Sequence, residues 1–223
     1  MEFDKDLTAR QEARELAWRA ETAQRKLAEL SQSQLDAIME AVAKAFAAQA
    51  SALAEMAVQE TGFGNAEDKV TKNLFASQRV AEAVRGMRTV GLLREVPEKK
   101  LWEIGVPVGV IAAIVPSTNP TSTVCYKAMI ALKSGNAIVF SPHPKAIACT
   151  RKAAQIVAEA AQAAGAPADA VACLSIPSLD GCQELMKAEP VRLILATGGP
   201  GMVKAAYSSG KPAIGVGAGN GPA

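Results

Sequence analysis

Apolar residues recur every three or four positions along the first ninety residues, which is the period of amphipathic helices. One apolar face covers residues 7–30. A second covers residues 35–56, after Ser31 and Ser33, either of which can cap a helix. A glycine-containing break follows, and we expect a third helix over residues 67–85. The charged faces of these helices are typical of solvated surface.

The pattern changes near residue 88. Residues 88–107 predict two exposed strands around a turn at Pro97. Beyond them, short apolar runs alternate with helical segments, and the first run is the continuous Val/Ile/Ala pattern of a strand buried on both faces. The five predicted strands cover residues 108–115, 137–140, 171–175, 191–196 and 213–216. This alternation predicts an α/β fold, a Rossmann-like parallel sheet with helices on both faces, preceded by the helical segment and a β-hairpin.

Composition restricts the class of protein further. Residues are 49% hydrophobic but only 4% aromatic, which favours helices on a buried sheet over an aromatic-rich β-sandwich. The 24 basic and 22 acidic residues nearly cancel, so we expect neither nucleic acid nor a membrane as a partner. The longest apolar run, residues 106–116, is shorter than the roughly 20 residues that cross a bilayer. The N-terminus is too charged for a secretory signal. We expect a cytoplasmic protein.

The four cysteines and the single histidine limit the chemistry. Because no C-x-x-C spacing occurs, the sequence predicts neither a zinc site nor a disulfide framework. The cysteines fit packing positions, although Cys125 follows a loop at a helix start, where a lowered thiol pKa is the alternative. No Ser-His-Asp arrangement can be assembled from His143. That histidine could contact a nucleotide, act as a base or cap a helix, and catalysis is the least favoured of the three.

Three strand-to-helix loops are expected at the carboxyl edge of the sheet, where parallel α/β sheets bind ligands. They cover residues 116–120, 141–144 and 197–201, and each is expected to present free backbone N–H groups at a helix start. The glycine-rich loop 197–201 is the best phosphate candidate, and its alternative is a tight turn that needs positive φ. It is not G-x-G-x-x-G, and no acidic residue ends the second strand. These features predict a domain that binds a phosphorylated ligand.

Asn119 follows the first buried strand. Its carboxamide could donate a hydrogen bond to a developing oxyanion. The alternative is an asparagine that only turns the chain before a helix.

Four segments, in order, resemble those of CoA-acylating aldehyde dehydrogenases: GVPVGVIAAIVPSTNPTST at 105–123, IVFSPHP at 138–144, LATGGPGMVKAAY at 195–207 and IGVGAGN at 214–220. The likeness extends over the N-terminal helices, including EDKVTKN at 67–73. In particular, the chain resembles the aldehyde dehydrogenase half of bifunctional aldehyde-alcohol dehydrogenases.

The resemblance implies NAD-dependent, reversible conversion of a short-chain aldehyde and coenzyme A to an acyl-CoA. A cysteine thiolate would attack the aldehyde, a hydride would pass to the nicotinamide, and coenzyme A, as co-substrate, would take the acyl group. Asn119 matches the oxyanion-stabilising asparagine. The residues that correspond to dinucleotide contacts are Ile114, Pro116, Ser117, Thr118, Ser141, Pro142, His143, Thr197, Gly198, Gly199, Met202 and Gly217.

The same resemblance implies an organisation. Residues 1–87 would be helices that pack on the cofactor domain, residues 88–107 an oligomerisation-type hairpin, and residues 108–223 the dinucleotide-binding domain. We therefore expect a homo-oligomer, dimer or higher.

Two departures from the wider superfamily matter. Hydrolytic members place a glutamate before a Gly-Gly pair to activate water, whereas residues 213–223 contain no acidic residue. Water attack should then lose much of the roughly 10²- to 10⁴-fold that a general base supplies, so coenzyme A can compete. The lysine that usually follows the second strand is replaced within residues 141–143, so ribose recognition differs and NADP stays open beside NAD.

The family's nucleophilic cysteine lies in a separate catalytic domain, and none of the four cysteines matches it. We expect a partial chain that is inactive alone. The alternative is a non-catalytic nucleotide-binding or assembly module derived from the same fold.

Overall fold

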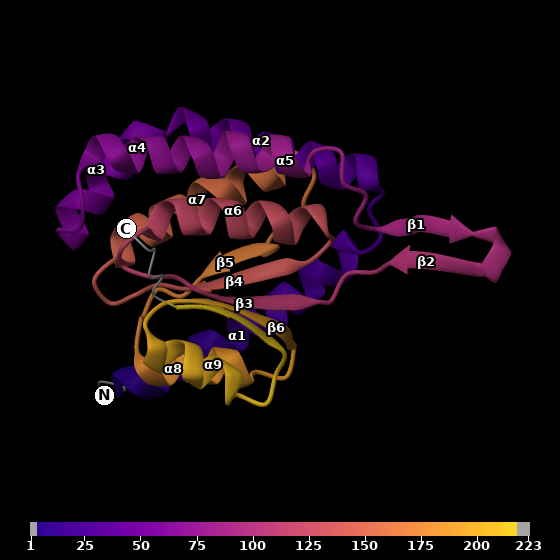
Figure 1. The fold of residues 1–223 in the computed structure, drawn as a ribbon. Helices are drawn as coiled ribbons and strands as arrows, with labels where there is room; N and C mark the ends of the chain where they lie inside the picture. The colour runs from indigo at the N-terminus through magenta and orange to yellow at the C-terminus, as the bar shows by residue number, and fades with distance from the viewer. Residues whose placement is uncertain (1–3, 218–223) are drawn as a thin grey trace.

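The computed structural model describes residues 4–217 (Figure 1). At its centre is a parallel five-stranded sheet in the order β5-β4-β3-β6-β7. The strands are β3 (Val110–Ile114), β4 (Ala137–Ser141), β5 (Val171–Cys173), β6 (Val191–Thr197) and β7 (Ala213–Val216). The chain moves outward from β3 to β5 and then returns to the other side of β3. The topological switch point therefore lies between β3 and β6, where open α/β sheets bind ligands.

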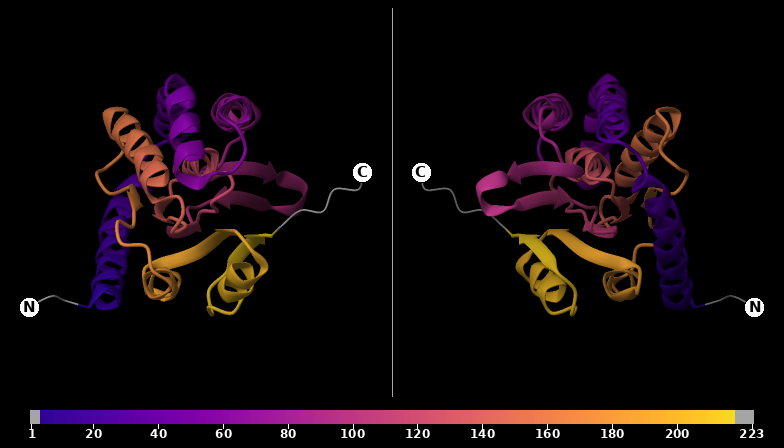
Figure 2. Two further views of the ribbon diagram at one scale, coloured as in Figure 1. Left: turned by 90° about the vertical axis from the view of Figure 1, so that its left-hand side faces the viewer. Right: turned by 90° about the vertical axis from the view of Figure 1, so that its right-hand side faces the viewer.

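Helices cover both faces of the sheet, as the alternating pattern predicted (Figures 1 and 2). Helices α6 (Pro120–Lys133) and α7 (Ile147–Ala163) cover one face, and α8 (Leu179–Lys187) and α9 (Pro200–Tyr207) cover the other. Helix α1 (Lys5–Leu27) lies beside α8 and contacts β4. Its buried face is almost entirely alanine, which lets the helix approach the sheet closely. The predicted α/β fold is confirmed.

The remaining N-terminal helices form an outer layer over α6 and α7. They are α2 (Gln32–Ala48), α3 (Ala50–Thr61), α4 (Ala66–Leu74), the π-helical turn η1 (Phe75–Arg79) and α5 (Val80–Val84). Ser31 caps α2 in a capping box with Gln34. One continuous core includes residues from α1, the outer layer and the sheet.

One predicted helix in this layer was wrong. The apolar face expected over residues 35–56 belongs to two helices, because the chain bends by 64° between α2 and α3 at Gln49. The bend keeps both Phe46 and Leu53 buried. The expected third helix is confirmed over residues 66–84, and it contains a π-helical turn between α4 and α5.

The predicted exposed strands form an antiparallel hairpin that projects from the body (Figure 1). It consists of β1 (Gly91–Val96), the 3-10 turn η2 (Pro97–Lys99) and β2 (Leu101–Gly105). The hairpin and the segment after it expose apolar side chains, namely Leu92, Leu93, Leu101, Trp102, Ile104, Val106 and Val108. Within residues 4–217, no single helix has the length and apolar content that a membrane crossing requires. Helices α2 and α3 meet these two criteria only when taken together as a bent pair.

Candidate functional site

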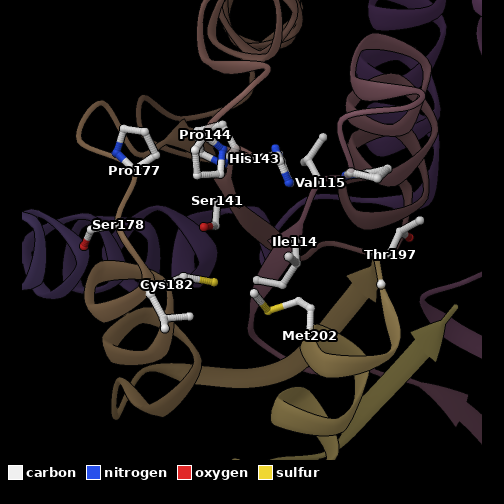
Figure 3. A pocket seen from close by; sticks show the side chains of 15 residues that line it. Ile114, Val115, Ser141, His143, Pro144, Pro177, Ser178, Cys182, Thr197 and Met202 are labelled. Carbon is white, nitrogen blue, oxygen red and sulfur yellow. The ribbon is translucent and has the colours of Figure 1, made fainter. Parts of the chain in front are cut away.

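A cavity of about 230 Å³ lies at the carboxyl ends of β3, β4 and β6 (Figure 3). Its walls also include Pro177, Ser178, Leu179 and Cys182, which lie at or near the start of α8. Nine residues that the sequence predicted for cofactor contact line this cavity: Ile114, Pro116, Ser141, Pro142, His143, Thr197, Gly198, Gly199 and Met202.

A second cavity, of about 510 Å³, continues from the first. The two share Pro116, His143, Thr197, Gly198 and Gly199. The second cavity adds the four remaining predicted residues, Ser117, Thr118, Asn119 and Gly217. The fold therefore brings all the predicted residues to one crevice at the switch point, which we call the edge crevice.

Gly198 and Gly199 leave open space in the edge crevice. Neither has positive φ, and Gly199 has a φ of −66°, so the alternative of a turn that needs left-handed glycine is wrong. A Cβ added at Gly199 would meet nothing within 4 Å, and one at Gly198 would touch only the Met202 side chain at an ordinary 3.6 Å. Since neither backbone strain nor packing requires glycine here, the absence of side chains leaves room for a ligand.

The helix starts around the edge crevice differ in whether they are capped. Helices α6 and α9 have no side-chain cap. The Gly198 N–H is already bonded to the Val216 carbonyl at 3.1 Å, so the donors of α9 that can serve an anion begin at Gly199. Two uncapped helix starts thus flank the switch point and favour a negatively charged group there.

The third expected anion loop, residues 141–144, does not run directly into a helix, so that prediction was wrong. Helix α7 begins only at Ile147, and the carboxylate of Glu60 from α3 accepts the N–H groups of Ala148 and Cys149, each at 2.7 Å. Burial favours the neutral carboxyl, but hydrogen bonds from Cys149 and the neighbouring amides outweigh it and lower the pKa of Glu60. A side chain of the protein therefore already accepts the free N–H groups at this helix start.

His143 lines both parts of the edge crevice. Its Nδ1 accepts the Lys145 N–H at 3.0 Å, which places the proton of the neutral ring on Nε2. Burial, with a smaller effect from the Lys145 charge, lowers the pKa of His143, so the ring is neutral at pH 7. The His143 side chain therefore accepts a hydrogen bond within its own loop through Nδ1, and its Nε2–H remains as a donor for a ligand.

Asn119 lies where the edge crevice meets a groove of about 550 Å³ between α4, η1 and α6. Although Asn119 is the N-cap residue of α6, its side chain does not cap the helix. Its Oδ1 accepts a hydrogen bond from Lys72 Nζ at 3.2 Å, and its Nδ2 is 3.5 Å from Thr118 Oγ1. The carboxamide is thus held from the α4 side rather than used to turn the chain.

The groove beside Asn119 was not predicted. Its lining is mostly apolar and includes Phe75, Ala76, Val80 and Tyr126. Phe75 begins the π-helical turn, and π-helical turns often occur at functional sites. The sequence predicted a helix over residues 67–85, and the resemblance singled out residues 67–73, but the sequence carries no signal for the π-helical turn.

Lys127 was also missed. It is 2% exposed, and its Nζ donates to the carbonyls of Ile114 at 2.9 Å and Leu195 at 2.8 Å. Burial lowers its pKa to about 7. These bonds tie the ends of β3 and β6 together beneath the edge crevice. A lysine within a helix otherwise rich in buried residues was the available signal.

None of the four cysteines is poised as a nucleophile. Cys125, Cys149 and Cys182 are buried, and Cys173 is partly buried. Burial raises the pKa of every one of them, to about 12 for Cys149 and Cys173. The packing interpretation of Cys125 is confirmed, because a reactive cysteine needs a lowered pKa. Among the described residues, no cluster of His, Cys, Asp and Glu could hold a metal ion.

Comparisons with known proteins converge on one family. The aldehyde dehydrogenase family model matches residues 5–214. The chain is 53% identical over 207 residues to the bifunctional aldehyde-alcohol dehydrogenase AdhE of Escherichia coli strain K12. The aligned residues cover 93% of this chain and 23% of that protein.

Solved structures agree. The acetylating aldehyde dehydrogenase of Geobacillus thermoglucosidasius superposes with a TM-score of 0.96 at 54% identity, over 97% of this chain and 48% of that one. Propionaldehyde dehydrogenase of Rhodopseudomonas palustris with bound propionyl-CoA gives a TM-score of 0.80 at 33% identity, over 93% of this chain and 46% of that one. The chain thus spans less than half the length of these relatives.

Proposed function

Because the chain belongs to the aldehyde dehydrogenase family, we propose that it is the nucleotide-binding part of a CoA-acylating enzyme that converts a short-chain aldehyde, coenzyme A and NAD to an acyl-CoA and NADH. One observation carries the proposal. Gly198 and Gly199 leave unfilled space at an uncapped helix start, at the switch point of a doubly wound sheet. That geometry suits a diphosphate.

The two parts of the edge crevice suggest how NAD lies. Ser178 and Met202 would hold the adenosine end in the first cavity, and Gly199 would hold the diphosphate. The nicotinamide end would then be held near Asn119 in the second cavity. When bound, NAD supplies the hydride acceptor. His143 can donate its Nε2–H to an acceptor on the ligand, and no carboxylate follows β4 to select NAD over NADP.

Asn119 supplies a hydrogen-bond donor where charge develops. An aldehyde in the groove would place its chain against Phe75 and Tyr126 and its carbonyl near the carboxamide. A donor that stabilises an oxyanion contributes about 10²- to 10³-fold to the rate. We place the nucleophilic thiol outside residues 1–223, because the cysteines within them are buried or partly buried and burial raises their pKa.

The missing acidic residue supports acyl transfer to coenzyme A over hydrolysis. No Asp or Glu occurs in residues 213–223, of which residues 218–223 lie outside the described part. Without a general base on this segment, water is a poor competitor for the acyl group. The Rhodopseudomonas palustris relative with bound propionyl-CoA is consistent with this choice.

The projecting hairpin supports an oligomer. Trp102 is 66% exposed and Ile104 is 60% exposed, and exposed apolar patches commonly mark protein interfaces. We propose that a second copy of the chain covers this surface.

Calorimetric titration of the purified chain with NAD, and separately with coenzyme A, tests the proposal. We expect saturable binding of NAD. A folded sample without affinity for either ligand would overturn the assignment.

A second assay separates the acylating enzyme from the non-catalytic module. CoA-dependent NADH formation is expected only when the polypeptide that supplies the nucleophilic cysteine is present. NADH formation by residues 1–223 alone would show that the thiol lies within them. NAD binding with no activity, even when that polypeptide is present, would favour the module.

A further inference from the structure

Helix α4 holds the chain on both sides of Asn119. Before it, Lys69 Nζ donates to the Thr118 carbonyl at 2.7 Å. After it, Thr121 Oγ1 donates to Asn73 Oδ1 at 2.8 Å. Lys69 and Asn73 are one helical turn apart and therefore lie on the same face of α4. The Asn119 loop is thus held at two points by a helix that lies 47 to 49 positions earlier in the chain.

These two contacts are built into the interior of the protein. Lys69 is 5% exposed and Asn73 is 1% exposed. Asn73 Nδ2 donates to the Ala50 carbonyl at 2.9 Å, which fixes the orientation of this amide and turns its oxygen toward Thr121. Buried polar groups in such chains of hydrogen bonds have little freedom to rearrange. The contacts therefore define the position of the loop.

Lys72 acts on the Asn119 carboxamide itself. An ammonium group is only a donor, so Lys72 Nζ can hold the oxygen end of the carboxamide but not its NH₂ end. A flipped carboxamide would place two donors against each other. The NH₂ group is therefore turned away from Lys72, with only a long 3.5 Å contact to Thr118 Oγ1. Only this end of the carboxamide can stabilise a negatively charged oxygen.

We propose that α4 is the positioning element of the oxyanion site: Lys69 and Asn73 set the loop, and Lys72 orients the Asn119 carboxamide so that its NH₂ group faces the reacting oxygen. The proposal rests on the proposed function for the role of Asn119. It assigns a purpose to the segment 67–73, which the cofactor site leaves unexplained. Lys72 is a positioning residue, because it acts through Asn119.

The kinetic test uses the complete acylating enzyme that contains residues 1–223. Lys72→Met should lower kcat by about 10- to 100-fold, because a misplaced group of this kind costs on that order, and should leave KM for NAD unchanged. Lys72→Arg, which restores a donor, should recover most of kcat. Lys44→Met, at an exposed position of α2, is the matched control and should change neither constant.

Two kinetic results would overturn the proposal. If Lys72→Met raises KM for the aldehyde, coenzyme A or NAD and leaves kcat intact, Lys72 binds that ligand directly. If Lys72→Arg is as slow as Lys72→Met, a hydrogen bond to Asn119 is not what matters.

A spectroscopic test on the chain alone keeps this inference separate from the proposed function. In nitrogen-15 spectra, Lys72→Met should shift the side-chain amide signals of Asn119, and Lys44→Met should not. Thr121→Val should speed amide hydrogen exchange of the loop after Asn119. Unchanged Asn119 signals in Lys72→Met would defeat the positioning role. An unmodified complete enzyme without CoA-dependent activity would instead defeat the proposed function, and the spectra would still decide the orientation.

Discussion

The side-chain nitrogen of Lys127 donates a hydrogen bond to the carbonyl oxygen of Leu195 at 2.8 Å, although the two residues are 68 positions apart. The same group bonds the Ile114 carbonyl at 2.9 Å, so one buried side chain ties β3 to β6 at the switch point. The edge crevice opens directly above this link. A residue that does not line the crevice thus joins the two strands at its base.

Lys127→Met should remove a pH dependence of stability. Burial lowers the pKa of Lys127 from 10.5 to about 7, so between these values the unfolded chain binds more protons than the folded one. The free energy of unfolding contributed by Lys127 therefore rises with pH, by at most about 1.4 kcal/mol per pH unit. Urea unfolding from about pH 7 to about pH 9 should show the unmodified chain gaining stability relative to Lys127→Met. A constant difference between the two would contradict the assignment.

Gly199→Asp should separate ligand binding from stability. An aspartate is a better N-cap than glycine for α9, so the melting temperature should hold or rise. The same carboxylate would accept hydrogen bonds from the free N–H groups of α9 and would repel a diphosphate. NAD affinity should therefore fall by about 10-fold or more. Calorimetry and thermal melting check the two effects. Undiminished NAD binding in a folded Gly199→Asp sample would place the diphosphate elsewhere.

The matched control is Gly165→Ala. Gly165 has a φ of +102°, in the region that favours glycine, and a Cβ there meets no atom within 4 Å. Backbone strain should cost about 1 kcal/mol of stability. NAD affinity should stay unchanged, which is the opposite of the pattern expected for Gly199→Asp.

Glu60→Gln should weaken the start of α7 in a pH-dependent way. Loss of the charged cap should cost about 1 kcal/mol at neutral pH. Because the pKa of Glu60 is lowered in the folded state, the stabilisation is present above the ordinary carboxyl pKa and is lost as pH falls through the folded value. Chemical unfolding should therefore show the difference between the two proteins shrinking in acid. A difference that persists unchanged at acid pH would argue that shape, rather than charge, matters.

Ile104→Glu should break the association of chains through the hairpin. Ile104 pairs across the strands with Leu92, and both side chains are exposed in the single chain. A charge there should leave the folding free energy within about 0.5 kcal/mol but lower the mass seen by sedimentation. Lys44→Glu, at an exposed position of α2, should leave the mass unchanged. A mass unaffected by Ile104→Glu would exclude the hairpin as the interface.

The sequence determined the sheet and the residues of its carboxyl edge. Continuous apolar runs require strands buried on both faces, and their alternation with helices requires parallel pairing. Because the ends of parallel strands meet at one edge, loops as distant in sequence as those at Asn119 and Gly199 could be placed together before any contact was known. The observed edge crevice contains every predicted site residue.

Only the tertiary structure decided which side chains contact the loops at this edge of the sheet. Apolar periodicity runs through Gln49 without interruption, so it could not reveal the bend between α2 and α3. Glu60 caps a helix 88 positions away, and Lys72 reaches Asn119 across 47 positions. Charged side chains on an amphipathic helix look alike along the sequence whether they face water or a distant loop. Which of them finds a partner depends on how the helices cross, and local patterns do not encode that crossing.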